Sequence, residues 1–99
     1  MAEREDTVSE ERLQKYFDIT QEALNMIQEQ GIDEERADQA HDVLDMAQRY
    51  YDDAHHFREK GGIVTAFAAL NYAHGWLDCG ARLGLFNVKD SRLFTVDDE

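Results

Sequence analysis

GIVTAFAALNYAHGWLDCGARLGLF, residues 62–86, is a mostly apolar run in a chain that is otherwise rich in charge. At roughly 100° per residue, its apolar positions divide into two groups on a helix. One group contains Ile63, Phe67, Leu70, Leu77 and Ala81, and a seam of small residues contains Ala66, Ala69, Ala73 and Gly80. A helix that is apolar nearly all round is buried on several sides. We therefore expect a central helix over about residues 62–84, the most buried of the fold.

Four polar residues interrupt this run, which is otherwise about as long as a membrane span. They are Asn71, His74, Asp78 and Arg82. Each charge near the centre of a bilayer costs at least about 2.5 kcal/mol. The sequence therefore predicts the central helix of a soluble bundle and no membrane-spanning segment.

Two glycines, Gly75 and Gly80, lie inside the predicted helix. Each costs on the order of 1 kcal/mol relative to alanine in a helix interior. Because glycine lets another backbone or side chain approach closely, we expect a neighbouring segment near these positions.

The four polar residues form the first candidate site, because steps of three, four and four place them on one strip of the helix. His74 and Asp78 can meet directly, and so can Asp78 and Arg82. The favoured interpretation is a polar network that satisfies its own hydrogen bonds and fixes the helix register. The alternative is a functional site in which Asp78 orients the His74 imidazole and Arg82 anchors an anion.

Two further helices precede the central one, over about residues 8–30 and 33–60. Thr7 with Glu10 matches a capping box, Ser9 is a second candidate cap, and Gly31 is the expected stop. Asp33 is the expected cap of the second helix, which ends at Gly61 and Gly62. Their apolar stripes have helical period, and the first contains Leu13, Tyr16, Phe17, Thr20, Ala23, Leu24 and Ile27.

The remaining residues, 85–99, form a short tail. Leu85 and Phe86 can fold back over the last turn of the central helix. The apolar residues Phe86, Val88, Leu93, Phe94 and Val96 then flank a polar turn, which suits a small hairpin or an irregular tail laid across the bundle. An exposed tail of this kind could also dock onto another chain.

The 99 residues make one domain with a net charge of −12. A phosphate backbone or an anionic membrane would be repelled, because the few cations are scattered along the chain. The acidity fits either a basic partner or adaptation to high internal salt, and the shortage of lysine favours salt adaptation. A single cysteine and the lack of a secretory signal at the N-terminus favour a reducing, cytoplasmic location.

Metal and cofactor motifs are weak or missing, so we expect neither a metal nor a cofactor. Asp52 and His55 are the nearest approach to a metal-binding pair, and no phosphate-binding glycine loop is present. An arginine followed by a histidine after four to six residues is typical of some helical ribonuclease-like domains. Arg36 with His41, and Arg49 with His55 or His56, fit that spacing, although chance alone would give about one such match.

The segments MAQRYYDDAHHF (46–57), Glu59-Lys60-Gly61, TAFAALNYAHGWLDCGARLGLF (65–86) and Arg92-Leu93-Phe94 carry a family resemblance. Over most of its length the chain resembles an archaeal family known only as domain of unknown function 357. The resemblance implies a small helical bundle. It implies no activity and no functional residue.

Together these features predict an all-α, three-helix antiparallel bundle with a short C-terminal tail or hairpin, able to dimerise into a larger bundle. The leading function is a non-enzymatic interaction or scaffold module whose partner is another protein or a second copy. Its expected partner surface contains Tyr72, Trp76, Leu83, Leu93, Phe94 and the rest of the tail to Val96. The alternative is a small enzyme or ligand-binding domain that uses the His74 strip, or a ribonuclease-like domain that uses an Arg–His pair.

Overall fold

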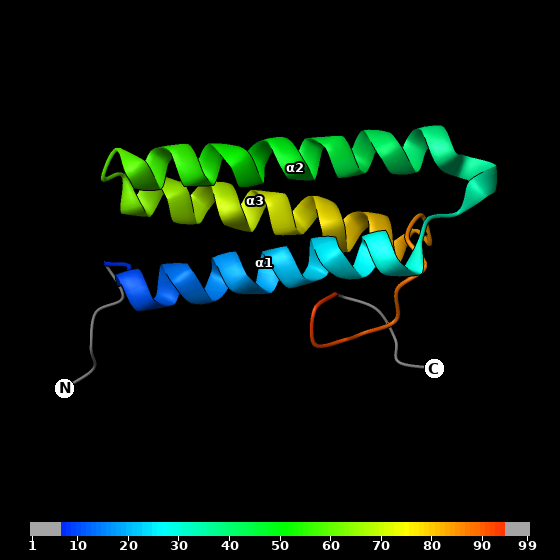
Figure 1. Ribbon diagram of the computed structural model, residues 1–99, viewed down its shortest axis with the longest axis horizontal. Coiled ribbons are helices and arrows are strands. Elements are labelled where there is room, and N and C mark those ends of the chain that lie inside the picture. Colours follow the sequence, from blue (N-terminus) through cyan, green and yellow to red (C-terminus); the bar gives the residue numbers. More distant parts are fainter. Residues whose placement is uncertain (1–6, 95–99) are drawn as a thin grey trace.

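The computed structural model describes residues 7–94, and these residues form three α-helices that run antiparallel in succession (Figure 1). α1 spans Glu10–Gln30, a 3₁₀ turn η1 spans Glu34–Arg36, α2 spans Ala37–Glu59 and α3 spans Ile63–Arg82. The predicted three-helix bundle is confirmed, with helix ends displaced by a few residues. Expectations that concern Val96 and the end of the tail lie outside the described residues.

The first helix begins at a local cap. Ser9 accepts a hydrogen bond from the Arg12 backbone N–H through its hydroxyl oxygen at 3.1 Å. Of the two candidate caps, Ser9 is therefore the one used, and the expected Thr7 capping box is wrong. Gly31 ends the helix in a left-handed conformation (φ +88°) and donates its N–H to the Ile27 carbonyl at 2.8 Å, as its position predicts.

The second helix begins later than expected. Asp33 caps the 3₁₀ turn, because its carboxylate accepts the Glu35 N–H at 3.1 Å. The backbone of Arg36 (φ −123°, ψ 35°) then departs from helical values, and regular α-helix starts only at Ala37. The Arg36 side chain bonds to Asp33 and to the far end of α3, which accounts for the interruption.

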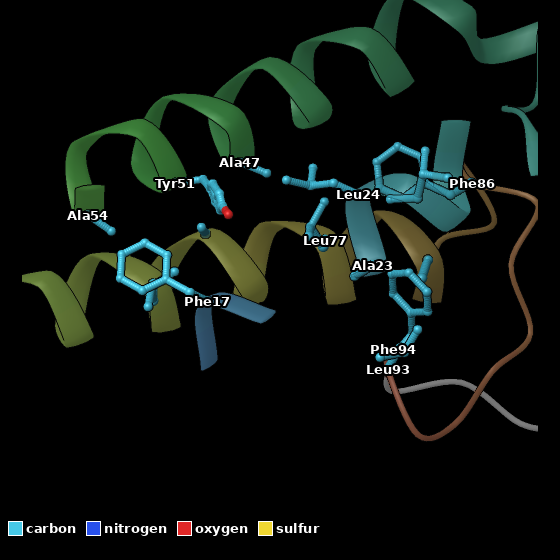
Figure 2. Packing of buried hydrophobic residues seen from close by; sticks show 14 of the residues in the cluster. Phe17, Ala23, Leu24, Ala47, Tyr51, Ala54, Leu77, Phe86, Leu93 and Phe94 are labelled. Atoms are coloured by element: carbon cyan, nitrogen blue, oxygen red, sulfur yellow. The ribbon is translucent and has the colours of Figure 1, made fainter. Parts of the chain in front are cut away.

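The small-residue seam of α3 is buried, as predicted. Ala66, Ala69, Ala73 and Gly80 are all buried, and α2 contributes its own buried alanines Ala40, Ala47 and Ala54. α2 and α3 share the most extensive helix–helix interface, and α3 lies between α2 and α1 in Figure 1. Figure 2 shows Ala47 and Ala54 pointing from α2 toward α3, with Phe17, Tyr51, Leu24 and Leu77 filling the space between the helices. α3 is therefore the central element around which the core forms.

The expected close approach at Gly80 is confirmed, and its neighbour is Phe86. A Cβ atom added at Gly80 would lie 2.8 Å from Cζ and 2.9 Å from Cδ2 of the Phe86 ring, which is 2% exposed. A Schellman turn folds this ring back, with Leu85 N–H donating to the Gly80 carbonyl at 2.9 Å and Gly84 in a left-handed conformation. At Gly75 the result differs: no heavy atom of the described chain lies within 4 Å of an added Cβ.

The tail crosses the end of the bundle and forms no hairpin within the described residues. Ile32 and Phe86 form an isolated antiparallel bridge, since Asn87 donates its N–H to the Gly31 carbonyl at 2.9 Å and Asp33 donates to the Leu85 carbonyl at 2.9 Å. The hairpin expectation is wrong because these backbone groups pair with the α1–α2 connection. The alternative, an irregular tail across the bundle, is correct.

Candidate functional site

His74 is half-buried and links three parts of the fold. Its Nε2 lies 2.6 Å from the Leu93 carbonyl oxygen in the tail, and its Nδ1 lies 3.4 Å from the Thr20 hydroxyl oxygen on α1. A carbonyl oxygen only accepts, so the geometry assigns the proton to Nε2. In the neutral ring Nδ1 then accepts the Thr20 hydroxyl proton. His74 thus holds the tail to the α1–α3 pair.

The rest of the predicted strip is divided between the interior and the surface. The Asp78 carboxylate lies 3.8 Å from His74 Nε2, so the expected His74–Asp78 pair forms at long range. Asn71 and Arg82 are exposed. The strip therefore contains two half-buried residues, His74 and Asp78, and two exposed ones.

A shallow cavity of about 340 Å³ lies beside His74. Its lining residues are Tyr16, Ile19, Asn71, His74, Gly75, Asp78 and Arg92. The position is concave, as an active site requires, but the neighbours of His74 already occupy both of its nitrogens. A proton-transfer role would require the bond to the Leu93 carbonyl to break. The geometry favours a structural role for His74.

Arg92 lines the same cavity and was not predicted from the sequence. Its guanidinium donates to both carboxylate oxygens of Glu22 on α1, at 2.6 and 3.4 Å. The hydrogen bond to Glu22, together with the charges of Glu22 and Asp90, raises the pKa of Arg92 above its ordinary value. Since Glu22 and Arg92 are 70 positions apart, no sequence pattern could have paired them. The Arg92–Glu22 pair is thus a second contact that holds the tail against α1, after the one through His74.

The arginines of the possible Arg–His pairs are engaged elsewhere. Arg36 donates to Asp33 at 2.8 Å and to the carbonyls of Leu83 and Gly84 at 2.9 and 3.2 Å, so it caps the C-terminal end of α3. The hydrogen bond from Arg36, followed by that from the Glu35 N–H, lowers the pKa of Asp33. Arg49 pairs with Asp45 at 2.9 Å. These contacts do not direct either arginine toward an anion site shared with a histidine.

Asp52 and His55, the nearest approach to a metal-binding pair in the sequence, each contact another residue. Asp52 accepts a hydrogen bond from Gln48 at 3.0 Å, and the His55 ring packs on Phe17 with centroids 4.3 Å apart. Among the described residues, no three His, Cys, Asp or Glu side chains gather in a group able to hold a metal ion. Asp52 and His55 therefore have separate partners, a glutamine amide for Asp52 and an aromatic ring for His55.

The exposed side of α3 is a stripe without acidic side chains. Three large apolar side chains are exposed there: Val64 (63%), Tyr72 (56%) and Leu83 (57%). With the residues between them on the same side, they form what we call the open face, which consists of Val64, Ala68, Tyr72, Gly75, Trp76, Cys79 and Leu83. At 100° per residue these positions span an arc of about 120°, with the exposed Arg82 at one edge, so they make one continuous surface along the helix.

The middle of the open face is hollow. A cavity of about 280 Å³ is lined by Asn71, Tyr72, Gly75, Trp76 and Cys79. The indole N–H of Trp76 is buried and has no hydrogen-bond partner among the described residues. An unsatisfied buried donor costs about 1–3 kcal/mol. Residues 7–94 thus contain no neighbour that explains the glycine at position 75 or the unsatisfied donor at position 76.

The predicted partner surface is only partly exposed. Tyr72 and Leu83 are exposed and Trp76 is half-buried, whereas Leu93 and Phe94 are each 2% exposed. Figure 2 places Leu93 and Phe94 beside Ala23 of α1. The expectation for these two residues is therefore corrected: they belong to the core and not to an accessible surface.

Comparison with known proteins gives a family and no activity. Residues 15–86 match the family described as "Protein of unknown function (DUF357)". No curated protein and no solved structure matches the chain. Within residues 7–94, no helix has the combination of length and hydropathy needed to cross a bilayer.

Proposed function

The chain belongs to the DUF357 family of proteins of unknown function, and we propose that it is a non-enzymatic protein-interaction module that docks through the open face of α3. The observation that carries this proposal is the absence of acidic side chains along that face in a chain of net charge −12. Solvated faces elsewhere in the chain carry carboxylates. A contiguous exposed apolar surface of this kind is typical of interaction sites.

The energetic support comes from the exposed side chains. Burying a Val or Leu side chain completely is worth about 1.5–3 kcal/mol. Val64, Tyr72 and Leu83 are each a little more than half exposed, so each would contribute on the order of 1 kcal/mol on docking.

The enzymatic alternatives receive less support. The cavity beside His74 favours a small-molecule site, but His74 is bonded to Leu93 and Thr20 on both sides. The ribonuclease-like alternative relies on Arg36 or Arg49, and other groups of the chain already engage both arginines. We extend the proposal to a cytoplasmic, salt-adapted archaeal setting, which the acidic composition and the single exposed cysteine support.

A comparative pull-down tests the proposed function. Tagged wild-type protein and the Gly75→Glu variant are purified from the host at its own internal salt, and the mass and composition of each eluate are determined. Gly75→Glu places a charge in the centre of the open face where an added Cβ has no neighbour among the described residues, so the fold is preserved. Gln28→Glu, on the exposed side of α1, adds the same charge elsewhere.

We expect a reproducible partner, or a second copy of the chain, with wild type and Gln28→Glu and its loss with Gly75→Glu. A wild-type protein that is strictly monomeric and partnerless would refute the interaction-module proposal. Equal capture by all three proteins would show that docking uses another surface.

A further inference from the structure

We infer that the open face of α3 docks onto the same face of a second copy, with the two α3 helices antiparallel and the two-fold axis passing between Gly75 and Trp76. This inference rests on the proposed function, since it requires the open face to be a docking surface, and it names the partner. A two-fold contact uses the same patch on both molecules, so the patch must be complementary to itself.

The order of large and small residues along α3 provides that complementarity. With the axis between Gly75 and Trp76, each residue faces the one equally distant on the other side. Trp76 then lies opposite Gly75 of the second copy, and Tyr72 lies opposite its Cys79. Leu83 lies opposite its Ala68, so that every large side chain of the central stretch meets a small one.

The hollow and the glycine fit this arrangement. The 280 Å³ cavity between Tyr72, Trp76 and Cys79 lies next to the inferred axis, and Gly75 leaves it open. Inside a single chain a Cβ atom added at Gly75 would meet no described neighbour, whereas the space beside Gly80 is filled by the Phe86 ring. A bulky side chain from a second copy would occupy the space that Gly75 leaves. This contact would explain why a glycine stands at that position.

Charge favours a second copy over a basic partner. A basic protein would be recognised by carboxylates, and the open face has none. Two copies that each carry −12 repel one another, so they can meet only through a surface that excludes acidic side chains from the contact. Because salt screens this repulsion, association should strengthen as salt is raised.

The size of the face predicts a weak dimer. The 20 residues of α3 extend about 30 Å, and a helix with its side chains is about 10 Å wide, which gives roughly 300 Å² per copy. The total of about 600 Å² is below the roughly 1,200 Å² of a standard interface. Tyr50 of α2 extends the surface, because its ring packs on that of Tyr72 with centroids 4.4 Å apart. We therefore expect reversible, concentration-dependent association.

Disulfide trapping tests the position of the axis. In a Cys79→Ala background, Gly75→Cys introduces one thiol per chain next to the axis, where the two thiols of a dimer lie within reach of each other. Gln28→Cys in the same background is the matched control on α1. Under mild oxidation at host salt, we expect a covalent dimer from Gly75→Cys and little from Gln28→Cys. Equal trapping of both, or none with Gly75→Cys, would overturn the inference.

Sedimentation equilibrium over a wide concentration series tests the face without any cross-link. We expect wild type and Gln28→Glu to dimerise with the same constant and Gly75→Glu to bind at least about tenfold more weakly. A dimer that survives Gly75→Glu would overturn the inference. A monomeric wild type that still captures a partner through Gly75 would also overturn it while leaving the proposed function intact. A monomer that captures nothing would refute both.

Discussion

The same substitution, glycine to alanine, should change stability in opposite directions at two positions of α3. Gly75 and Gly80 are five residues apart on one helix, and each should gain on the order of 1 kcal/mol of helix propensity from alanine. At Gly75 the new methyl group meets no described neighbour within 4 Å, so the gain is kept. We expect Gly75→Ala to raise the free energy of unfolding by about 1 kcal/mol.

At Gly80 the new methyl group overlaps the Phe86 ring. The added Cβ would lie 2.8–2.9 Å from two ring atoms, and the ring is buried and held by the Schellman turn. Overpacking a buried site of this kind costs typically about 1–3 kcal/mol. After the propensity gain, we expect a net loss of about 1 kcal/mol for Gly80→Ala, and a difference of about 2 kcal/mol between the two variants.

Urea unfolding followed by far-ultraviolet circular dichroism measures this difference. The protein concentration is kept low enough for wild type to be monomeric, so that self-association does not contribute. In thermal unfolding, a difference of about 2 kcal/mol corresponds to about 10 °C for a domain of this size. If Gly80→Ala stabilises the protein as much as Gly75→Ala, the packing of Phe86 on Gly80 is wrong.

A double-mutant cycle identifies the source of the cost. Phe86→Leu removes the ring atoms that the new methyl group meets, so Gly80→Ala should be less harmful in the Phe86→Leu background than in wild type. An equal cost in both backgrounds would show that the ring is not responsible.

Three further predictions concern the ties that hold α3 and the tail. Arg36→Lys should lower the free energy of unfolding by about 1 kcal/mol in urea, because lysine cannot bond two carbonyls and Asp33 together; an unchanged midpoint would contradict the capping role. The pKa of Asp33 is lowered by its hydrogen bonds from Arg36 and the Glu35 N–H, so its charge stabilises the fold above the ordinary value of 3.8, and this contribution is lost as the pH falls through the lowered pKa. Asp33→Asn should therefore lose stability less steeply than wild type below about pH 4 in acid titrations, and parallel curves would refute the effect. His74→Ala should lower the free energy of unfolding by about 1–3 kcal/mol and expose the tail, so that the Phe94 amide exchanges faster with solvent while the α2 amides do not. Unchanged protection of the Phe94 amide would show that His74 does not hold the tail.

Features that depend on neighbours in the chain could be predicted well. The helical period of the apolar residues gave the three helices, and the small residues of α3 marked the face that packs on α2. Caps and stops such as Ser9, Asp33 and Gly31 act within a few residues, so local patterns identify them. Where two local signals competed, as Thr7 and Ser9 did, only the backbone geometry selected one.

The candidate site was predicted less completely. The spacing of His74 and Asp78 correctly placed them on one strip, yet the atoms that bind His74 belong to Thr20 and Leu93. Leu93 and Phe94 were expected at the surface, but Arg92 and His74 draw the tail into the core. The exposed positions of Tyr72 and Leu83 followed from the helical pattern of α3.

The sequence by itself determined the three helices and the central place of α3, because helical period and capping operate over one or two turns. Only the tertiary structure decided that Gly80 holds a phenylalanine ring while Gly75 remains open, although both are glycines in the same helix. It also decided that Arg36 caps a helix end 47 residues away. Such contacts depend on how the helices dock and where the tail crosses them. Packing between distant segments sets those arrangements, and no spacing within one segment encodes them.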